Sequence, residues 1–159
     1  MTTSSKRYYG WMMWLIAAVF YSLDYFQHTA PSVLIEPIAH TLNVDYTIIG
    51  NIMGIYFPIY AIAQLPAGFL LDRYGVRSVL SLACLVVSLG LVVGTTATIS
   101  MLVLSRTLIA VGSAFAFLGA LKTASAWLPE KTFPIAVGLT NTIGVAGGII
   151  GQPFLNQMI

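Results

Sequence analysis

Long apolar runs, joined by short polar links, are the feature of this sequence that most limits its possible folds. Five runs can be drawn. Each is long enough to cross a bilayer core as a helix, which needs roughly 20 residues. The runs cover residues 10–35, 47–71, 78–97, 101–128 and 133–155, and residues 1–9 precede them. Only helices can cross lipid in such a chain, since backbone N–H and C=O groups must be paired within each segment. The sequence therefore predicts an all-α integral membrane protein with five transmembrane helices.

Composition argues against the common soluble classes. Apolar residues make up 58% of the 159 and charged residues 8%, whereas about a quarter of an average soluble domain is charged. The single cysteine, Cys84, allows neither an intrachain disulfide nor a cysteine metal cluster. No H-E-x-x-H metal pair, no G-x-S-x-G nucleophile and no basic face for nucleic acid occurs. We therefore expect no enzyme, no cofactor, no metal site and no nucleic-acid partner.

Lysine and arginine in the short links predict the orientation, because these residues favour the cytoplasmic side of a membrane. The bases that flank one set of span ends are Lys6, Arg7, Arg73, Arg77 and Lys131. The links on the opposite side, residues 36–46 and 98–100, contain neither lysine nor arginine. Residues 1–9 are therefore expected to form a cytoplasmic N-terminus.

The turn "GFLLDRYGVR" contains residues that the preference of lysine and arginine for the cytoplasmic side does not require. Gly75 permits a positive φ in a tight turn, and Gly68 lets another helix approach closely. Asp72 stands at a helix end, where it can pair with the arginines or accept hydrogen bonds from the N-terminal amides of another helix. From these residues alone, a solvated turn and a functional site are equally good interpretations.

The longer segment "YAIAQLPAGFLLDRYGVR", residues 60–77, resembles a known family pattern. It is similar to the G-x-x-x-D-R-x-G-R-[RK] loop between helices two and three of the major facilitator superfamily. The matching residues are Gly68, Asp72, Arg73, Gly75 and Arg77, preceded by Gln64 and Pro66. Val76 departs from the pattern, which usually has a base there.

Two later segments extend the resemblance to essentially the whole chain. Arg106 with Gly112 resembles an arginine and glycine that the family often has in helix four. Trp127 with Pro129 resembles the W-[FL]-P ending common among organic-anion symporters and sugar-phosphate permeases. The fifth run lacks the Gly-Pro pair of the antiporter signature, which argues against drug export. The resemblance identifies the chain with helices one to five of the N-terminal six-helix bundle.

The resemblance implies a mechanism and a location. Two six-helix halves would rock about a central site, as in secondary transporters, and Asp72 would latch against the second half when the cytoplasmic side is closed. That half is absent from this sequence, so we expect residues 1–159 alone to show no uphill transport. The expected location is a bacterial inner membrane.

Four residues with acidic or basic side chains fall inside the predicted spans, Asp24, His28, Arg106 and Lys122, where a charge costs about 2.5–3.5 kcal/mol on insertion scales. Asp24 and His28 lie four residues apart and share a helical face. A rise of about 1.5 Å per residue puts Asp24 roughly 16 Å and His28 about 10 Å below the outer end of the first span. Arg106 lies about 8 Å below the same surface, so its side chain should reach His28 directly and Asp24 through a water.

The resemblance puts helices one and four on the cavity wall. We therefore predict that Arg106 anchors an anionic substrate and that Asp24 and His28 couple transport to protons. Simpler interpretations stay open, in which Arg106 snorkels outward and the other two form an intrahelical pair beside Pro31. Lys122 does not share the face of Arg106 and is expected to snorkel toward the cytoplasmic side.

Small and aromatic residues predict packing rather than chemistry. G-x-x-x-G pairs allow close helix contact, and they are Gly50 with Gly54, Gly144 with Gly148, and Gly147 with Gly151. The aromatic residues near the N-terminus fit an interfacial belt better than a ligand site, and they are Tyr8, Tyr9, Trp11 and Trp14.

Two functions from different classes fit these observations. The favoured one is secondary active uptake of a small organic anion with protons as the coupling ion, in a lipid bilayer and together with the remainder of a transporter. The alternative is a five-span membrane scaffold that binds partners without transport.

Overall fold

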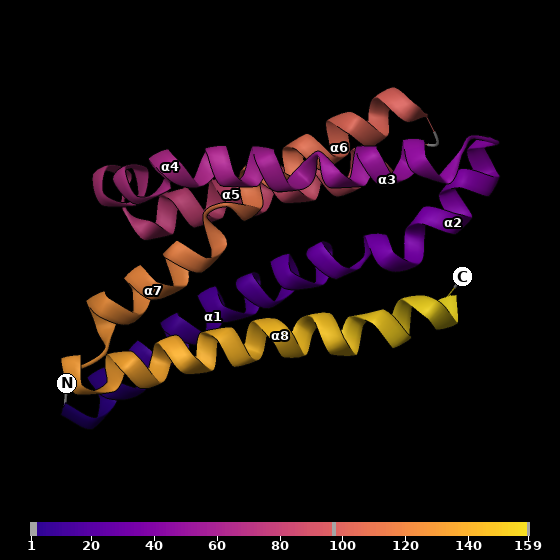
Figure 1. Cartoon of the computed structure of the whole chain (residues 1–159). Coiled ribbons are helices and arrows are strands. Elements are labelled where there is room, and N and C mark those ends of the chain that lie inside the picture. The colour runs from indigo at the N-terminus through magenta and orange to yellow at the C-terminus, as the bar shows by residue number, and fades with distance from the viewer. Residues whose placement is uncertain (1–2, 97, 159) are drawn as a thin grey trace.

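The computed structural model describes residues 3–96 and 98–158, and every element in these ranges is helical (Figure 1). The helices are α1 (Thr3–Thr29), α2 (Pro31–Leu42), α3 (Tyr46–Gly54), α4 (Tyr56–Tyr74), α5 (Val76–Gly94), α6 (Ile99–Ser113), α7 (Ala116–Trp127) and α8 (Phe133–Met158). A 3-10 turn, Glu130–Thr132, precedes α8. The predicted all-α fold class is confirmed.

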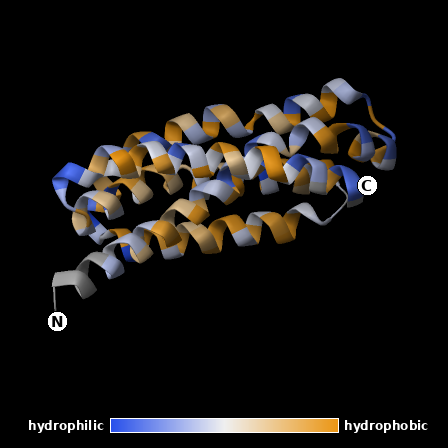
Figure 2. Cartoon of the chain, turned by 90° about the horizontal axis from the view of Figure 1, so that it is seen from below, coloured by the Kyte–Doolittle hydropathy of each residue, from blue (hydrophilic) through white to orange (hydrophobic). Residues whose placement is uncertain are grey.

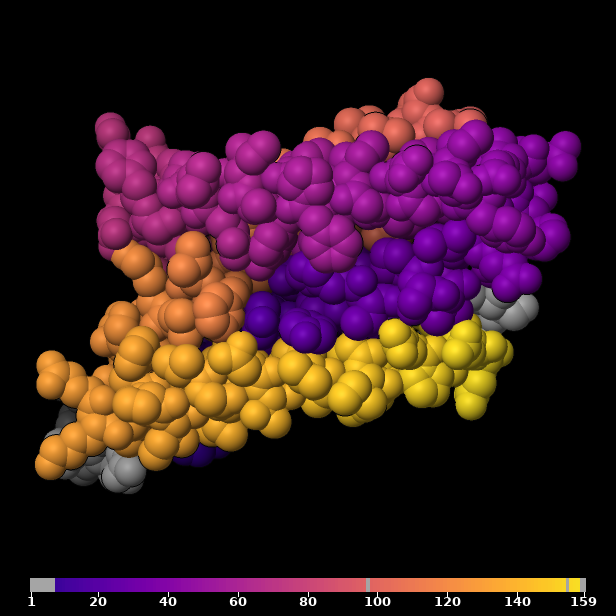
Figure 3. Space-filling view, in the orientation of Figure 1, coloured from indigo at the N-terminus to yellow at the C-terminus, as the bar shows by residue number. Residues whose placement is uncertain are grey.

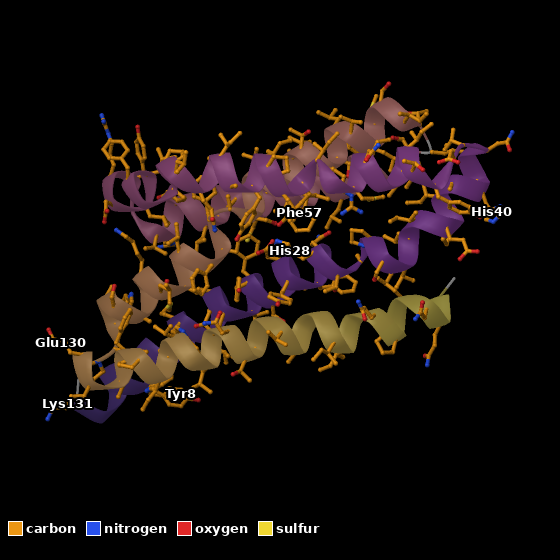
Figure 4. The ribbon with its side chains drawn as sticks, in the orientation of Figure 1. Tyr8, His28, His40, Phe57, Glu130 and Lys131 are labelled. Atoms are coloured by element: carbon orange, nitrogen blue, oxygen red, sulfur yellow. The ribbon has the colours of Figure 1, made fainter. Side chains whose placement is uncertain are left out.

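The chain runs back and forth along one long bundle (Figure 1). The N-terminus, the α4–α5 turn and the α7–α8 link lie at one end, and the α2–α3 link, the α5–α6 link and the C-terminus lie at the other. Arg73, Arg77 and Lys131 are exposed at the first end, where Figure 4 labels Lys131. This grouping agrees with the pattern used to predict orientation. The side chains of Lys6 and Arg7 lie outside the described part of the chain.

Four helical stretches are long and apolar enough to cross a membrane in the part of the chain that the structure describes: Tyr46–Tyr74, Val76–Gly94, Ile99–Trp127 and Glu130–Gln157. Hydrophilic residues gather toward the two ends of the bundle (Figure 2). The first predicted span, α1, is outside this set because its tyrosines, Asp24 and Gln27 lower its hydropathy. It nevertheless lies alongside the other helices and packs against both α7 and α8. In Figure 3, α1 is seen between α4 and α8, set back from the surface. The span limits within a bilayer remain predictions.

Three of the predicted spans are interrupted helices. Pro31 and Pro58 have no N–H to continue the helical ladder, and the breaks lie at Ala30 and Ile55. The third break, at residues 114–115, has no proline; there the Phe115 N–H bonds to the Gly112 carbonyl, in an i to i−3 pattern, at 3.4 Å. This break lets α6 pack against α4 and α5 while α7 packs against α1.

Glycine allows the closest helix contacts. Gly144, Gly147, Gly148 and Gly151 of α8 face side chains of α1, which confirms close packing for these two G-x-x-x-G pairs. A Cβ at Gly50 or Gly54 would meet no atom within 4 Å. That pair therefore forms no close contact in the described structure, because its face of α3 is turned away from the other helices.

Trp14 is buried and so does not belong to the interfacial aromatic belt predicted from the sequence. Its side chain is 4% exposed, and its Nε1 donates a hydrogen bond to Thr140 Oγ1 of α8 at 3.0 Å. Ala18, Ala124 and Leu128 complete the surrounding core. Tyr8 and Tyr9 are exposed, as a belt requires. The prediction for Trp14 was wrong because α1 lies between two helices, and the sequence does not show which of its aromatic residues face them.

We predict that Gly112→Ala destabilises the bundle. A Cβ there would lie 2.7 Å from the Ala83 carbonyl oxygen and 2.6 Å from Val87 Cγ2, so α5 and α6 must separate, at a cost of about 1–3 kcal/mol. Thermal unfolding in detergent measures the change.

Gly138→Ala is the matched control, because no atom lies within 4 Å of a Cβ at this position of α8. Alanine should stabilise that helix by about 0.5–1 kcal/mol. Equal melting temperatures for the two variants would contradict the assigned α5–α6 contact.

Candidate functional site

The Asp24 carboxyl group is buried near the middle of the bundle. Its residue is 2% exposed, and Oδ1 accepts a hydrogen bond of 2.8 Å from the Tyr56 hydroxyl of α4. A polar group at this depth needs such partners because no water replaces them. The bond joins α1 to the first turn of α4, directly after the break at Ile55.

His28 extends this polar centre by one helical turn. Its Nδ1 lies 3.1 Å from the Asp24 backbone oxygen and 3.7 Å from Asp24 Oδ1. The ring sits among the rings of Tyr56 at 4.6 Å, Tyr60 at 5.3 Å and Phe57 at 5.9 Å between centroids. Figure 4 shows His28 and Phe57 in the space between α1 and α4. The predicted pair of Asp24 and His28 therefore exists, inside an aromatic box.

The residues of α4 that form this box were missed in the sequence. Tyr56, Tyr60 and Gln64 recur every four residues and so share one face of α4. Gln64 Nε2 donates to the Tyr60 hydroxyl at 3.0 Å, which makes the face a connected polar stripe. Polar residues at a spacing of four in an otherwise apolar run were the signal that would have identified them.

Arg106 is buried as well, with 7% of the residue exposed. Tyr56 packs against Ile109 and Ala110, one turn farther along α6. No ion pair joins Arg106 to Asp24 among the described residues. The described contacts therefore join Asp24 to His28 and Tyr56 but do not join Arg106 to either member of the predicted pair.

Three buried side-chain atoms in the described residues have no hydrogen-bond partner: Asp24 Oδ2, Arg106 Nη1 and Ser113 Oγ. The Ser113 hydroxyl is near Asp24 and Tyr56, yet no hydrogen bond of acceptable geometry forms. An unsatisfied buried polar group costs about 1–3 kcal/mol, and more when charged. A carboxyl oxygen, a guanidinium nitrogen and a hydroxyl are thus left without a hydrogen-bond partner inside the bundle.

The predicted turn motif lies at the end of the bundle, away from this centre. Gly75 has φ of +80° and ends α4, which confirms the tight turn. Asp72 forms an ion pair with Lys122 of α7. The expectation that Lys122 merely snorkels is therefore incomplete, because its ammonium group has a defined partner. Gly68 faces open space in the described structure.

The two arginines of the motif point elsewhere. The Arg73 guanidinium carbon lies 5.8 Å from the centroid of the Phe69 ring and 5.6 Å from that of Tyr74. In the described part of the chain no ion pair involves Arg73 or Arg77. Asp72 therefore contacts Lys122 of α7, whereas Arg73 contacts two aromatic rings of its own helix.

Comparison with known proteins adds the family. The model of the Major Facilitator Superfamily matches residues 13–159. No solved structure gives a significant match.

Three curated relatives are transporters by their names. "Uncharacterized transporter YybO" of Bacillus subtilis (strain 168) is 31% identical over 138 residues, or 86% of this chain and 32% of that protein. "Probable galactarate/D-glucarate transporter GudP" of the same organism is 25% identical over 98% of this chain and 35% of its own length. "Probable anion transporter 7" of Oryza sativa subsp. japonica is 28% identical over 94% and 35%. The chain therefore spans 32% to 35% of the length of these relatives.

We predict that Tyr56→Phe lowers the free energy of unfolding by about 1–3 kcal/mol, because both Asp24 oxygens then lack a partner in the protein. Chemical unfolding in detergent micelles, followed by circular dichroism, measures the change.

Tyr46→Phe is the control, since Tyr46 is an exposed tyrosine of α3 whose hydroxyl hydrogen-bonds to His40 of α2, across the α2–α3 link. A loss of stability as large as that of Tyr56→Phe would show that the effect does not depend on Asp24.

Proposed function

This chain belongs to the major facilitator superfamily, a family of membrane carriers and not of enzymes, and we propose that it forms one wall of an alternating-access transporter for a small organic anion. Its helices correspond to helices one to five of the N-terminal bundle. In this proposal the polar centre around Tyr56 is the part of the substrate site that lies on this wall.

The observation that supports the proposal most is the buried, unpaired Arg106. A guanidinium in an apolar surrounding requires a counter-charge or a full set of hydrogen bonds. Nη1 of Arg106 has no partner, and no ion pair involves it in the described structure. A substrate carboxylate supplies both the missing charge and the missing acceptor, and the planar fork of arginine fits a carboxylate with two parallel hydrogen bonds.

The names of the relatives support an anionic substrate. One is named as a galactarate/D-glucarate transporter and another as an anion transporter. A sugar dicarboxylate has carboxylates for Arg106 and hydroxyl groups that can donate to Asp24 Oδ2 and bond to Ser113. The three unpaired atoms of the site would then be satisfied together.

Asp24 and His28 are the proposed proton-coupling pair. A carboxyl oxygen and an imidazole nitrogen lie 3.7 Å apart, so a small movement of either side chain would bring them within hydrogen-bond distance for proton transfer. Protonation of Asp24 removes the negative charge next to the substrate and turns an acceptor into a donor. Binding of the anion and binding of a proton would therefore favour each other at this centre.

Asp72 is the proposed gate residue, with Gly68, Arg73, Gly75 and Arg77. Its ion pair with Lys122 holds the α4–α5 turn to α7, and its side chain is still 70% exposed. A helix of the second half could approach over the open surface at Gly68 and replace Lys122 as the partner of the Asp72 carboxylate. The positive residues at this end of the bundle support a cytoplasmic location for the N-terminus and the turn, in a bacterial inner membrane.

The test is anion binding by the chain in nanodiscs of neutral phosphatidylcholine, measured by isothermal titration calorimetry. We expect D-glucarate to bind and the neutral polyol sorbitol not to bind. Arg106→Gln should weaken D-glucarate binding by about ten-fold to a hundred-fold, because it removes a charge-assisted hydrogen bond.

Lys131→Gln removes a positive charge from an exposed position and should leave the affinity unchanged. The proposal is wrong if sorbitol binds as well as D-glucarate, or if no carboxylate in a panel of mono- and dicarboxylates depends on Arg106.

We further predict that D-glucarate binding by the native chain is accompanied by proton exchange, seen as a dependence of the binding enthalpy on the buffer. Asp24→Asn should remove this dependence, because an amide cannot titrate.

Asp45→Asn is the control. The Thr47 N–H bonds to Asp45 Oδ1 at 2.7 Å and lowers the pKa of that exposed carboxyl, so it stays ionised near neutral pH and exchanges no proton. Proton exchange that persists in Asp24→Asn would exclude Asp24 from coupling.

A further inference from the structure

An apolar groove lies on the bundle away from the polar centre, between α4, α5 and the break that follows α6. Its volume is about 460 Å³. Tyr74 and Ser78 line its end near the α4–α5 turn, and Val86, Val111 and Phe115 line the rest. The lining is almost entirely hydrocarbon, so this groove offers nothing to a soluble anion. It is called the α4–α5–α6 groove below.

The surroundings of the groove indicate contact with lipid. Val76–Gly94, which is α5, has a hydropathy of 2.3, the highest of the four candidate spans. Leu82, Leu85 and Leu89 of α5 are all more than half exposed. From Ser78 to Val86 the groove extends about 12 Å along the helix, which fits within one leaflet of a hydrocarbon core roughly 30 Å thick.

The end of the groove near the turn is positively charged. Arg73 lies over the ring of Tyr74, which lines the groove, and Arg77 directly precedes Ser78. Both arginines are exposed. Asp72, the carboxylate of the same turn, is neutralised by Lys122, and no ion pair involves either arginine among the residues described. Two exposed arginines therefore belong to the turn that adjoins this end of the groove.

We propose that the α4–α5–α6 groove binds one acyl chain of an anionic phospholipid, whose phosphate is held by Arg73 and Arg77. Basic pockets between membrane helices bind anionic lipid head groups in this way. A neutral lipid would leave the two arginines without a counter-charge. An apolar protein segment would fill the groove without using the bases of the adjoining turn. The site is independent of the anion site at Arg106.

The test is native mass spectrometry of the chain in detergent with added phosphatidylglycerol or phosphatidylcholine of equal chain length. Phosphatidylglycerol should be retained in preference. Arg73→Gln or Arg77→Gln should each reduce its retention about five-fold, and both together roughly twenty-fold, from the attraction of anionic lipid for one base. Lys131→Gln is the control, because Lys131 is exposed in another link at the same end, and it should have no effect.

A second pair of variants tests the groove itself. Leu82→Trp places an indole over the groove, whereas Leu85→Trp changes an equally exposed residue of α5 that does not line it. Only Leu82→Trp should reduce lipid retention, and soluble glycerophosphoglycerol should not compete, because it has no acyl chain. Unchanged circular dichroism verifies that each variant folds.

Several outcomes would overturn the proposal. Equal retention of the two lipids, or an equal loss in Lys131→Gln, would show a non-specific attraction. Full retention by Leu82→Trp would place the lipid elsewhere. A lipid-free dimer that Leu82→Trp dissociates would show that a second copy of the chain occupies the groove.

Discussion

The hydrogen bond from Tyr56 to Asp24 is the contact on which the rest of the structure depends. It places a carboxyl group between two sets of helices, one formed by α1, α7 and α8 and the other by α3 to α6. In an apolar bundle such a group must be satisfied locally, since the surrounding hydrocarbon provides no donor. The bond thereby fixes the register of α1 against α4, and it positions His28 inside its aromatic box.

Around this bond, the broken helices give the polar centre its shape. The break at Ile55 places Tyr56 in the first turn of a new helix, and the break after Ser113 turns α7 away from the path of α6. Side chains on either side of a break are freed from the close packing of a continuous helix pair. Ser113, whose hydroxyl is unpaired, directly precedes one break, and Tyr56, the partner of Asp24, directly follows another. A centre that stays partly unsatisfied in a chain otherwise well packed is what a binding site requires.

The α4–α5 turn separates its charges into two groups with different surroundings. Asp72 pairs with Lys122 of α7, and Arg73 lies against the rings of Phe69 and Tyr74 of its own helix. Gly75, with its positive φ, ends α4 directly after these residues. One short segment can thus serve a gate on one side and a lipid on the other.

The sequence by itself determined the all-α membrane architecture, the tight turn at Gly75, the family and the pairing of Asp24 with His28. Each of these depends on neighbours along the chain: apolar runs of sufficient length, a fixed motif, and a spacing of four residues. Only the tertiary structure decided that Tyr56 is the partner of Asp24, that Lys122 pairs with Asp72, and that Trp14 is buried. These contacts join helices that are distant in sequence, so the rotation of each helix about its axis decides them, and in apolar runs no local pattern specifies that rotation.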